Sequence, residues 1–140
     1  MRTLAFILAL ALPGLSAAQV GQIKTLSGDV RIERAGNSMP ASAGDRVAAA
    51  DVLVTGEDGQ VGVTFIDNTR LSLGPDSRLA LSRFRFDETT HEGEFLSTMH
   101  KGTLSIISGQ IAKGHPDAMK VKTPTSVLSV RGTRFLVKVD

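Results

Sequence analysis

The fold is decided by residues 51–81, which read DVLVTGEDGQVGVTFIDNTRLSLGPDSRLAL. Four short runs recur in this stretch at intervals of roughly eight to ten residues: 52–55, 61–65, 71–73 and 79–81. In each run large apolar side chains stand two residues apart. The residues between them include Gly62, Thr64, Ser72 and Ala80. Successive side chains of a β-strand point to opposite faces, so this period of two places the apolar residues on one face. The stretch therefore predicts four strands that each bury one face.

Turn-forming residues separate these runs and recur along the whole chain. Asp67-Asn68 fits a two-residue hairpin turn, because asparagine tolerates positive φ, and Pro75 fixes φ in the turn that follows. The other residues that we predict to form turns or corners are Gly28, Gly44, Gly102, Pro124, Gly132 and Thr133.

Runs of the same kind continue on both sides of the central stretch. Upstream, residues 20–26 and 29–34 are a hairpin candidate joined at Ser27-Gly28, and 35–43 read as a loop. Downstream runs lie at 95–99, 102–107, 119–123 and 127–139, with a turn predicted at 114–117. No run of ten or more residues has the spacing of an amphipathic helix. We therefore predict an all-β fold of short antiparallel strands, in a solenoid-like stack or a sandwich.

The first 18 residues read as a secretory signal peptide, in helical form, that precedes the β domain. A positive start at Arg2 is followed by the apolar run 4–12 and by the small residues Ser16-Ala17-Ala18. Nine residues of helix reach only about 14 Å, whereas a membrane core is about 30 Å thick. We expect cleavage before Gln19, no integral membrane segment afterwards, and a domain that spans residues 19–140.

The composition of that domain excludes several functions. Loss of Arg2 leaves 15 basic residues against 14 acidic ones, a net charge of +1, and the chain has neither Trp nor Tyr. Nearly balanced charge without stacking aromatics argues against a nucleic-acid partner. The chain also has no cysteine, which excludes thiol chemistry and thiolate metal sites.

No motif with catalytic or cofactor-binding spacing stands out. His91, His100 and His115 form no His-x-His or His-Glu-x-x-His pair, so we interpret them as scattered surface residues. The acids of 87–94 lie in one polar connection without the spacing of a calcium loop. No serine stands in a Gly-x-Ser-x-Gly motif. We predict no catalytic residue, no metal and no cofactor, and hence no enzymatic activity.

Cations gather in the last third of the chain, and four of them are our candidate partner-binding residues: Lys120, Lys122, Arg131 and Arg134. Arg131 could offer its guanidinium to a partner carboxylate. The structural alternative, which we favour for the corner 131–133, is that Gly132 permits the bend, Thr133 bonds the turn and Arg131 pairs with a nearby acid. For Lys120 and Lys122 the alternative is an edge strand that lysines protect from aggregation.

The order of the turn motifs resembles that of the FecR domain family. The motifs are Gly28-Asp29-Val30, Gly44-Asp45, Val54-Thr55-Gly56, Asp67-Asn68-Thr69, Lys101-Gly102-Thr103-Leu104, Val121-Lys122-Thr123-Pro124 and Val130-Arg131-Gly132-Thr133-Arg134-Phe135. The resemblance implies an all-β periplasmic domain that recognises another protein. Typical members sit in the inner membrane of Gram-negative bacteria and relay the state of an outer-membrane siderophore transporter to a sigma factor. This chain departs from them, because we expect a stand-alone secreted member without the anti-sigma and transmembrane regions.

We therefore expect a non-enzymatic periplasmic domain that binds an envelope or membrane protein in a sensory or regulatory role. One alternative is a structural or self-assembling module of the envelope. Another is a glycan-binding module, which the absence of Trp and Tyr disfavours. The sequence leaves the partner's identity and the oligomeric state open.

Overall fold

The chain folds into strands over nearly its whole described length. The computed structural model describes residues 19–140, and the predicted signal peptide lies outside them. In chain order the strands are β1 (Gln19–Ser27), β2 (Val30–Arg34), β3 (Asn37–Pro40), β4 (Arg46–Ala48), β5 (Val52–Thr55), β6 (Gln60–Phe65), β7 (Arg70–Leu73), β8 (Arg78–Phe86), β9 (Gly93–Ile107), β10 (Met119–Lys122), β11 (Val127–Ser129) and β12 (Arg134–Val139). Two short helical segments, α1 (Gln110–Gly114) and η1 (Pro116–Ala118), join β9 to β10. The all-β prediction is confirmed.

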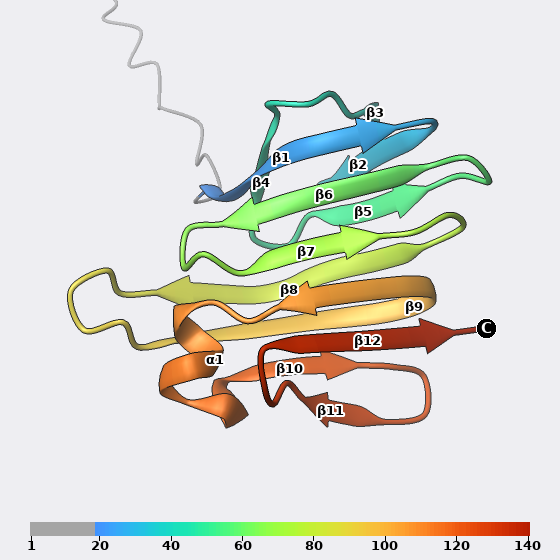
Figure 1. Cartoon of the computed structure of the whole chain (residues 1–140). Coiled ribbons are helices and arrows are strands. Elements are labelled where there is room, and N and C mark those ends of the chain that lie inside the picture. Colours follow the sequence, from blue (N-terminus) through green and yellow to red (C-terminus); the bar gives the residue numbers. More distant parts are fainter. Residues whose placement is uncertain (1–18) are drawn as a thin grey trace, which may run out of the picture.

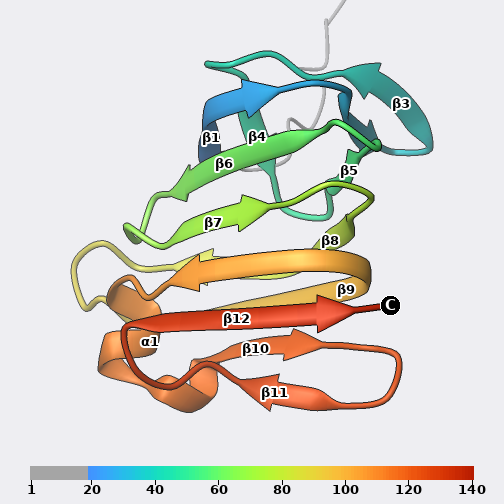
Figure 2. The same ribbon diagram turned by 45° about the vertical axis from the view of Figure 1, so that its right-hand side comes forward.

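The strands form one hydrogen-bonded sheet that curls over, so that two layers face each other (Figure 1). We name them layer A, with the order β4-β1-β6-β7-β9-β12, and layer B, with the order β3-β2-β5-β8-β9-β10-β11. All pairs are antiparallel except β10 with β9. Seen from a second direction, the strands of each layer lie one above another in a stack (Figure 2).

Strand β9 belongs to both layers. Its residues 93–101 pair with β8 in layer B, and residues 102–107 pair with β12 in layer A. The change of layer occurs at Gly102, whose φ is +101°. A Cβ at this position would clash with Ser77, so glycine is required both by the backbone conformation and by the space available.

The core fills the space between the layers. Ile23, Leu71 and Ile106 of layer A and Leu53 and Leu79 of layer B are all 0 or 1% exposed and belong to one apolar cluster. Burial of a large aliphatic side chain contributes about 1.5–3 kcal/mol. Three phenylalanines from strands of both layers add ring contacts with centroids 4.7–5.6 Å apart: Phe65, Phe84 and Phe95.

The chain crosses between the layers at one end of the molecule through turns that stack on one another. These stacked turns are 27–30, 55–60, 73–78 and the Gly102 corner. Backbone hydrogen bonds join each to the next: Gly56 N donates to Asp29 O (2.9 Å), Asp76 N to Gly56 O (3.0 Å), and Gly74 N to Thr103 O (3.0 Å). The bonds fix the order of the strands independently of the core.

Three local predictions were wrong. Residues 20–26 and 29–34 do not form a hairpin, because β1 lies in layer A and pairs with β6, whereas β2 lies in layer B and pairs with β5. Both strands carry an apolar face, and both faces reach the same core only if the chain crosses between the layers. The predicted loop 35–43 contains β3, an exposed edge strand, and the separate runs predicted at 95–99 and 102–107 belong to one strand, β9. The sequence predicted no helix at α1, which begins after the run 102–107 and ends at Gly114, the first residue of the predicted turn. A helix of five residues is too short to show a period.

Candidate partner-binding surface

The sandwich is open at the end formed by its last two strands. β12 pairs only with β9, and β11 pairs only with β10, so one edge of each layer lies uncovered here. A groove of 430 Å³ runs between the two edges. Its lining is Thr123, Pro124, Thr125, Ser126, Leu128, Val137, Lys138, Val139 and Asp140. At this end, therefore, the core reaches the surface.

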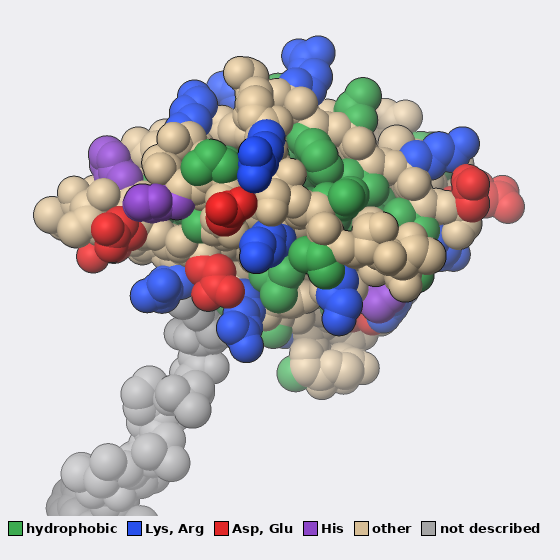
Figure 3. Space-filling model, turned by 90° about the horizontal axis from the view of Figure 1, so that it is seen from below, with side chains coloured by type: hydrophobic (Ala, Val, Ile, Leu, Met, Phe, Trp, Pro, Cys, Tyr) green, Lys and Arg blue, Asp and Glu red, His purple; other side chains and the backbone are tan. Residues whose placement is uncertain are grey.

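Apolar side chains are exposed beside the groove. Leu136 of β12 is 69% exposed and Val127 of β11 is 59% exposed, the two highest values among the large apolar residues of the described chain. Figure 3 looks onto this end and shows a strip of hydrophobic side chains with Lys and Arg side chains around it. An apolar strip with a charged rim is typical of a surface that a partner covers.

The four predicted binding cations surround this end but do not form one patch. Lys120 and Lys122 are exposed on β10, on the outer face of layer B, and Arg134 is exposed on β12, on the outer face of layer A. Arg131 lies in the connection between β11 and β12, where its Nη2 is 3.8 Å from Asp117 Oδ1. The sandwich separates residues that are neighbours in the sequence.

The corner 131–133 is held by backbone contacts. Ser108 Oγ donates to Gly132 O at 2.7 Å, and Ser108 N donates to Thr133 O at 2.9 Å. Gly132 has a φ of +84°, but a Cβ on it would meet no atom within 4 Å. The corner therefore carries the chain from layer B to layer A and leaves the Arg131 side chain in solvent.

The Asp67-Asn68 turn connects β6 to β7 and also contacts the start of α1. Asp67 is fully buried, and its Oδ2 accepts hydrogen bonds from Thr69 Oγ1 (2.7 Å) and Ile111 N (3.3 Å). Asp67 O accepts from Gln110 N at 2.8 Å, which ties the turn to the start of α1. Asn68 has a φ of 70°. The sequence predicted the turn but not its contact with residues more than 40 positions away.

The other predicted turn residues fall in three places. Gly28, Pro75 and Gly102 lie in the stacked turns. Gly44 lies in the loop before β4 with a φ of 93°, and Pro124 lies in the β10–β11 turn, where it lines the groove.

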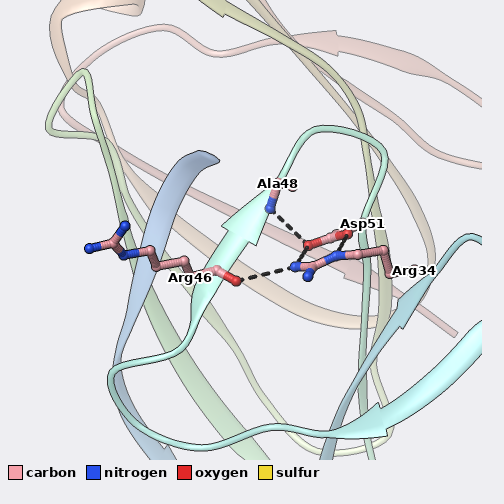
Figure 4. Close-up of polar contacts among 4 residues, drawn as sticks. All are labelled: Arg34, Arg46, Ala48 and Asp51. Carbon is pink, nitrogen blue, oxygen red and sulfur yellow. Dashed lines mark hydrogen bonds and ion pairs between the residues drawn. The ribbon is translucent and has the colours of Figure 1, made fainter. Parts of the chain in front are cut away.

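A partly buried ion pair that the sequence did not reveal, between the buried Asp51 and the half-exposed Arg34, joins the layers at the opposite end (Figure 4). Asp51 is 1% exposed, and its two oxygens accept from Arg34 Nε (2.9 Å) and Arg34 Nη2 (2.8 Å). Asp51 Oδ2 also accepts from Ala48 N at 2.8 Å, while Arg34 Nη2 donates to Arg46 O at 3.3 Å. The hydrogen bonds that Arg34 donates to Asp51 raise the pKa of Arg34 above its ordinary value. The pair is structural, because every carboxylate oxygen is already occupied.

The histidines and acids of the sequence are dispersed or engaged locally. His91 lies in the β8–β9 loop and stacks on Phe86 at 6.0 Å, whereas His100 lies on β9 and His115 follows α1. Within residues 19–140 no three potential metal ligands gather. Asp87 accepts hydrogen bonds from Thr89 N and Thr90 N, which lower the pKa of that carboxyl.

No helix within residues 19–140 is long and apolar enough to cross a membrane. Searches among curated proteins and among solved structures gave no significant match. The family model described as FecR protein matches residues 51–140. This region extends from Asp51 through β12 and includes both halves of β9 and the whole open end. The chain therefore belongs to the FecR family.

Proposed function

We propose that this protein is a non-enzymatic, periplasmic recognition domain that binds a partner protein by accepting an extended strand along β12. Membership of the FecR family points to a role in envelope signalling or regulation. Such a role needs a surface that recognises another protein. The open end of the sandwich is the observation that carries the proposal.

The β12 edge offers backbone pairing. An edge strand presents unpaired N–H and C=O groups, and a partner strand that pairs with them extends the sheet. β12 runs for six residues, whereas the other edge strands of the described chain are shorter: β3 has four residues, and β4 and β11 have three each. Of the usual protections of an edge strand, β12 contains no proline and no bulge, and its only charged side chains are Arg134 and Lys138. We therefore place the partner on β12.

The side chains of β12 specify the chemistry of the partner strand. Arg134, Leu136 and Lys138 face outward, while Val137 is buried and faces the groove. Residues directly opposite each other in paired strands contact, and opposite charges stabilise the pair. The partner strand should carry acids opposite Arg134 and Lys138 and an apolar residue opposite Leu136. Its two intervening residues should be apolar, because they cover the groove.

The experiment is selection of displayed hexapeptides on the purified domain, residues 19–140. We expect enriched peptides with the pattern acid, apolar, apolar, apolar, acid. Leu136→Lys should weaken their binding about tenfold or more, because it adds a charge where an apolar contact is expected. Val127→Lys is the matched control, since Val127 is exposed at the same end but lies on β11. Peptides without the pattern, or equal loss in both variants, would reject β12 as the site.

Two further measurements separate the alternatives. Affinity capture from envelope extracts with the native domain, and with Leu136→Lys as bait, identifies a partner whose recovery depends on β12. Light scattering after size-exclusion chromatography tests self-assembly. A dimer that Leu136→Lys converts to a monomer would show that β12 pairs with a second copy, and would support the structural alternative instead.

A further inference from the structure

We infer that the outer face of layer A binds an acidic polysaccharide chain. The strands of this layer carry five cations: Lys24, Arg46, Arg70, Arg134 and Lys138. None of the six strand segments of layer A contains an Asp or Glu. All five cations are exposed, and only Lys138 lies near an acid, 3.9 Å from Asp140. The face is thus positive without internal compensation.

Three of these cations stand in one straight row across the strands. Register pairs connect Arg46 to Gln22, Gln22 to Thr64, Thr64 to Arg70, Arg70 to Ile107 and Ile107 to Arg134. Strands are about 4.8 Å apart, so the arginines are spaced by about 14 Å and about 10 Å. A row of about 24 Å is too long for one small anion. It fits a polymer with repeated negative charges.

A lane of hydroxyl groups runs beside the arginine row. Two residues further along β6, β7 and β9, and three along β1 because of a bulge, Thr25 pairs with Gly62, Gly62 with Ser72, and Ser72 with Ser105. The lane lies about 7 Å from the arginine row, because each strand residue advances about 3.3 Å. At Gly62 the missing side chain leaves room for the Thr25 hydroxyl, which a Cβ would contact. The outer face of layer A is therefore depressed between the arginine row and the stacked turns.

Two hollows on the outer face of layer A provide a path for the polysaccharide. One, of 330 Å³, is lined by residues that include Gln22, Lys24, Arg46 and Thr64. The other, of 210 Å³, is lined by residues that include Thr25 and Ser72. Both are open rather than enclosed; the hollow beside Thr25 is lined mainly by polar surface, whereas the one beside Arg46 also includes Phe65 and Ile66. They suit hydrated sugar residues better than a compact apolar ligand.

The chemistry of the face favours a polysaccharide over a protein or a membrane. Protein interfaces depend on aromatic and other large apolar anchors at their centre. Here no aromatic side chain is exposed, and the lane consists of hydroxyls and glycine until it ends at the exposed Leu136, which lies at the β12 edge and not at the centre of the face. Hydroxyls donate and accept hydrogen bonds as sugar hydroxyls do. Guanidinium groups bind carboxylate or sulfate in a two-pronged geometry. An acidic sugar polymer satisfies both sets of groups at once.

The experiment measures binding of the native domain to polygalacturonate and dextran sulfate, with uncharged dextran as the reference polymer. We expect the two acidic polymers to bind and dextran not to bind. The variant R46Q/R70Q/R134Q should lose at least about tenfold in affinity at 0.1 M salt. The slope of log affinity against log salt should fall by about two to three, one for each lost contact. The matched control R85Q/K120Q/K122Q removes the same charge from layer B and should change affinity less than about twofold.

A second variant separates sugar recognition from charge alone. Ser72→Val removes one hydroxyl of the lane without a change of charge, and valine is well accommodated in a strand. It should weaken binding about threefold to tenfold with the salt slope unchanged. Equal losses in the two triple variants would overturn the proposal, since only net charge would then matter. Tighter binding of duplex DNA or of phosphatidylglycerol vesicles, with the same dependence on the arginine row, would overturn the assignment to a polysaccharide.

Discussion

The outer faces of the two layers use their cations in opposite ways. In layer B, Arg78 donates two hydrogen bonds to Glu33, at 2.9 and 2.6 Å, and Arg83 lies 3.7 Å from Glu94. In layer A, Arg46, Arg70 and Arg134 have no acid within ion-pair distance among residues 19–140. Both faces carry exposed cations, but only the strands of layer B also carry acids, among them Glu33 and Glu94. The difference is whether the partner of each charge lies inside the protein or outside it.

A cation stabilises the sheet when the register places an acid within its reach. The number of cations alone does not distinguish a stabilising face from a face that binds another molecule. An arginine that reaches a carboxylate across one intervening strand stabilises the sheet, as Arg78 does over β5. An arginine without such a carboxylate contributes little to folding. It remains available to bind another molecule. Four variants test this difference between the two faces.

The largest effect should come from Gly102→Val, because the two faces exist only while β9 changes layers. Valine at a φ of +101° is strained, and its side chain would collide with Ser77. We expect a loss of more than about 4 kcal/mol in the free energy of unfolding. Urea titration followed by circular dichroism measures it. Gly132→Val is the control: φ is +84° there, but a Cβ meets nothing, so the loss should be about 1–2 kcal/mol. Similar losses at both positions would contradict the steric account of the corner.

The next largest effect should come from Asp51→Ala, which removes the buried acid that holds Arg34 of β2. The substitution leaves Ala48 N without its acceptor and deprives the guanidinium of two charged hydrogen bonds. We expect a loss of about 3 kcal/mol, measured by urea titration. Glu57→Ala removes an exposed turn carboxylate and should change stability by less than about 0.5 kcal/mol. An equal loss in both would mean that Asp51 acts only through net charge.

A smaller, pH-dependent effect should come from Glu33→Gln. The hydrogen bond from Arg78 lowers the pKa of the Glu33 carboxyl below its ordinary value of 4.5. A carboxyl with a lowered pKa stabilises the fold above its ordinary pKa, and this contribution disappears as the pH falls through the lowered pKa. Thermal melts of both proteins should therefore differ most near pH 7 and converge in acid. A difference that stays constant down to pH 2 would refute an ionic origin.

The smallest effect on stability should come from the triple variant R46Q/R70Q/R134Q. Its side chains are exposed and have no acidic partner, so the free energy of unfolding should change by less than about 0.5 kcal/mol. Arg78→Gln, which breaks a paired cation of layer B, should lower the melting temperature more than all three substitutions together. The reverse order would abolish the distinction between the two faces.

The alternation of apolar residues was enough to predict the strands and most of the core, because period and burial are local properties. Residues 61–65 and 71–73 became β6 and β7 with the expected faces buried. Long-range pairing could not be predicted in this way. Glu33 and Arg78 are separated by 45 positions, and only the folded register brings them together. The row of Arg46, Arg70 and Arg134 also depends on long-range register and could not be predicted from the sequence. For this reason we grouped Arg134 with Lys120 and Lys122, which are nearer to it along the chain.

The corner in β9 has a consequence for how the domain folds. β9 pairs with β7 in layer A and with β8 in layer B, so the residues that precede Gly93 supply only four strands of each layer and lack the strand that belongs to both. We expect a chain truncated at residue 92 to remain unfolded, and the intact chain to unfold in a single cooperative step. During synthesis, we expect the first two thirds of the polypeptide to remain unfolded and prone to aggregation until β9 has been synthesised.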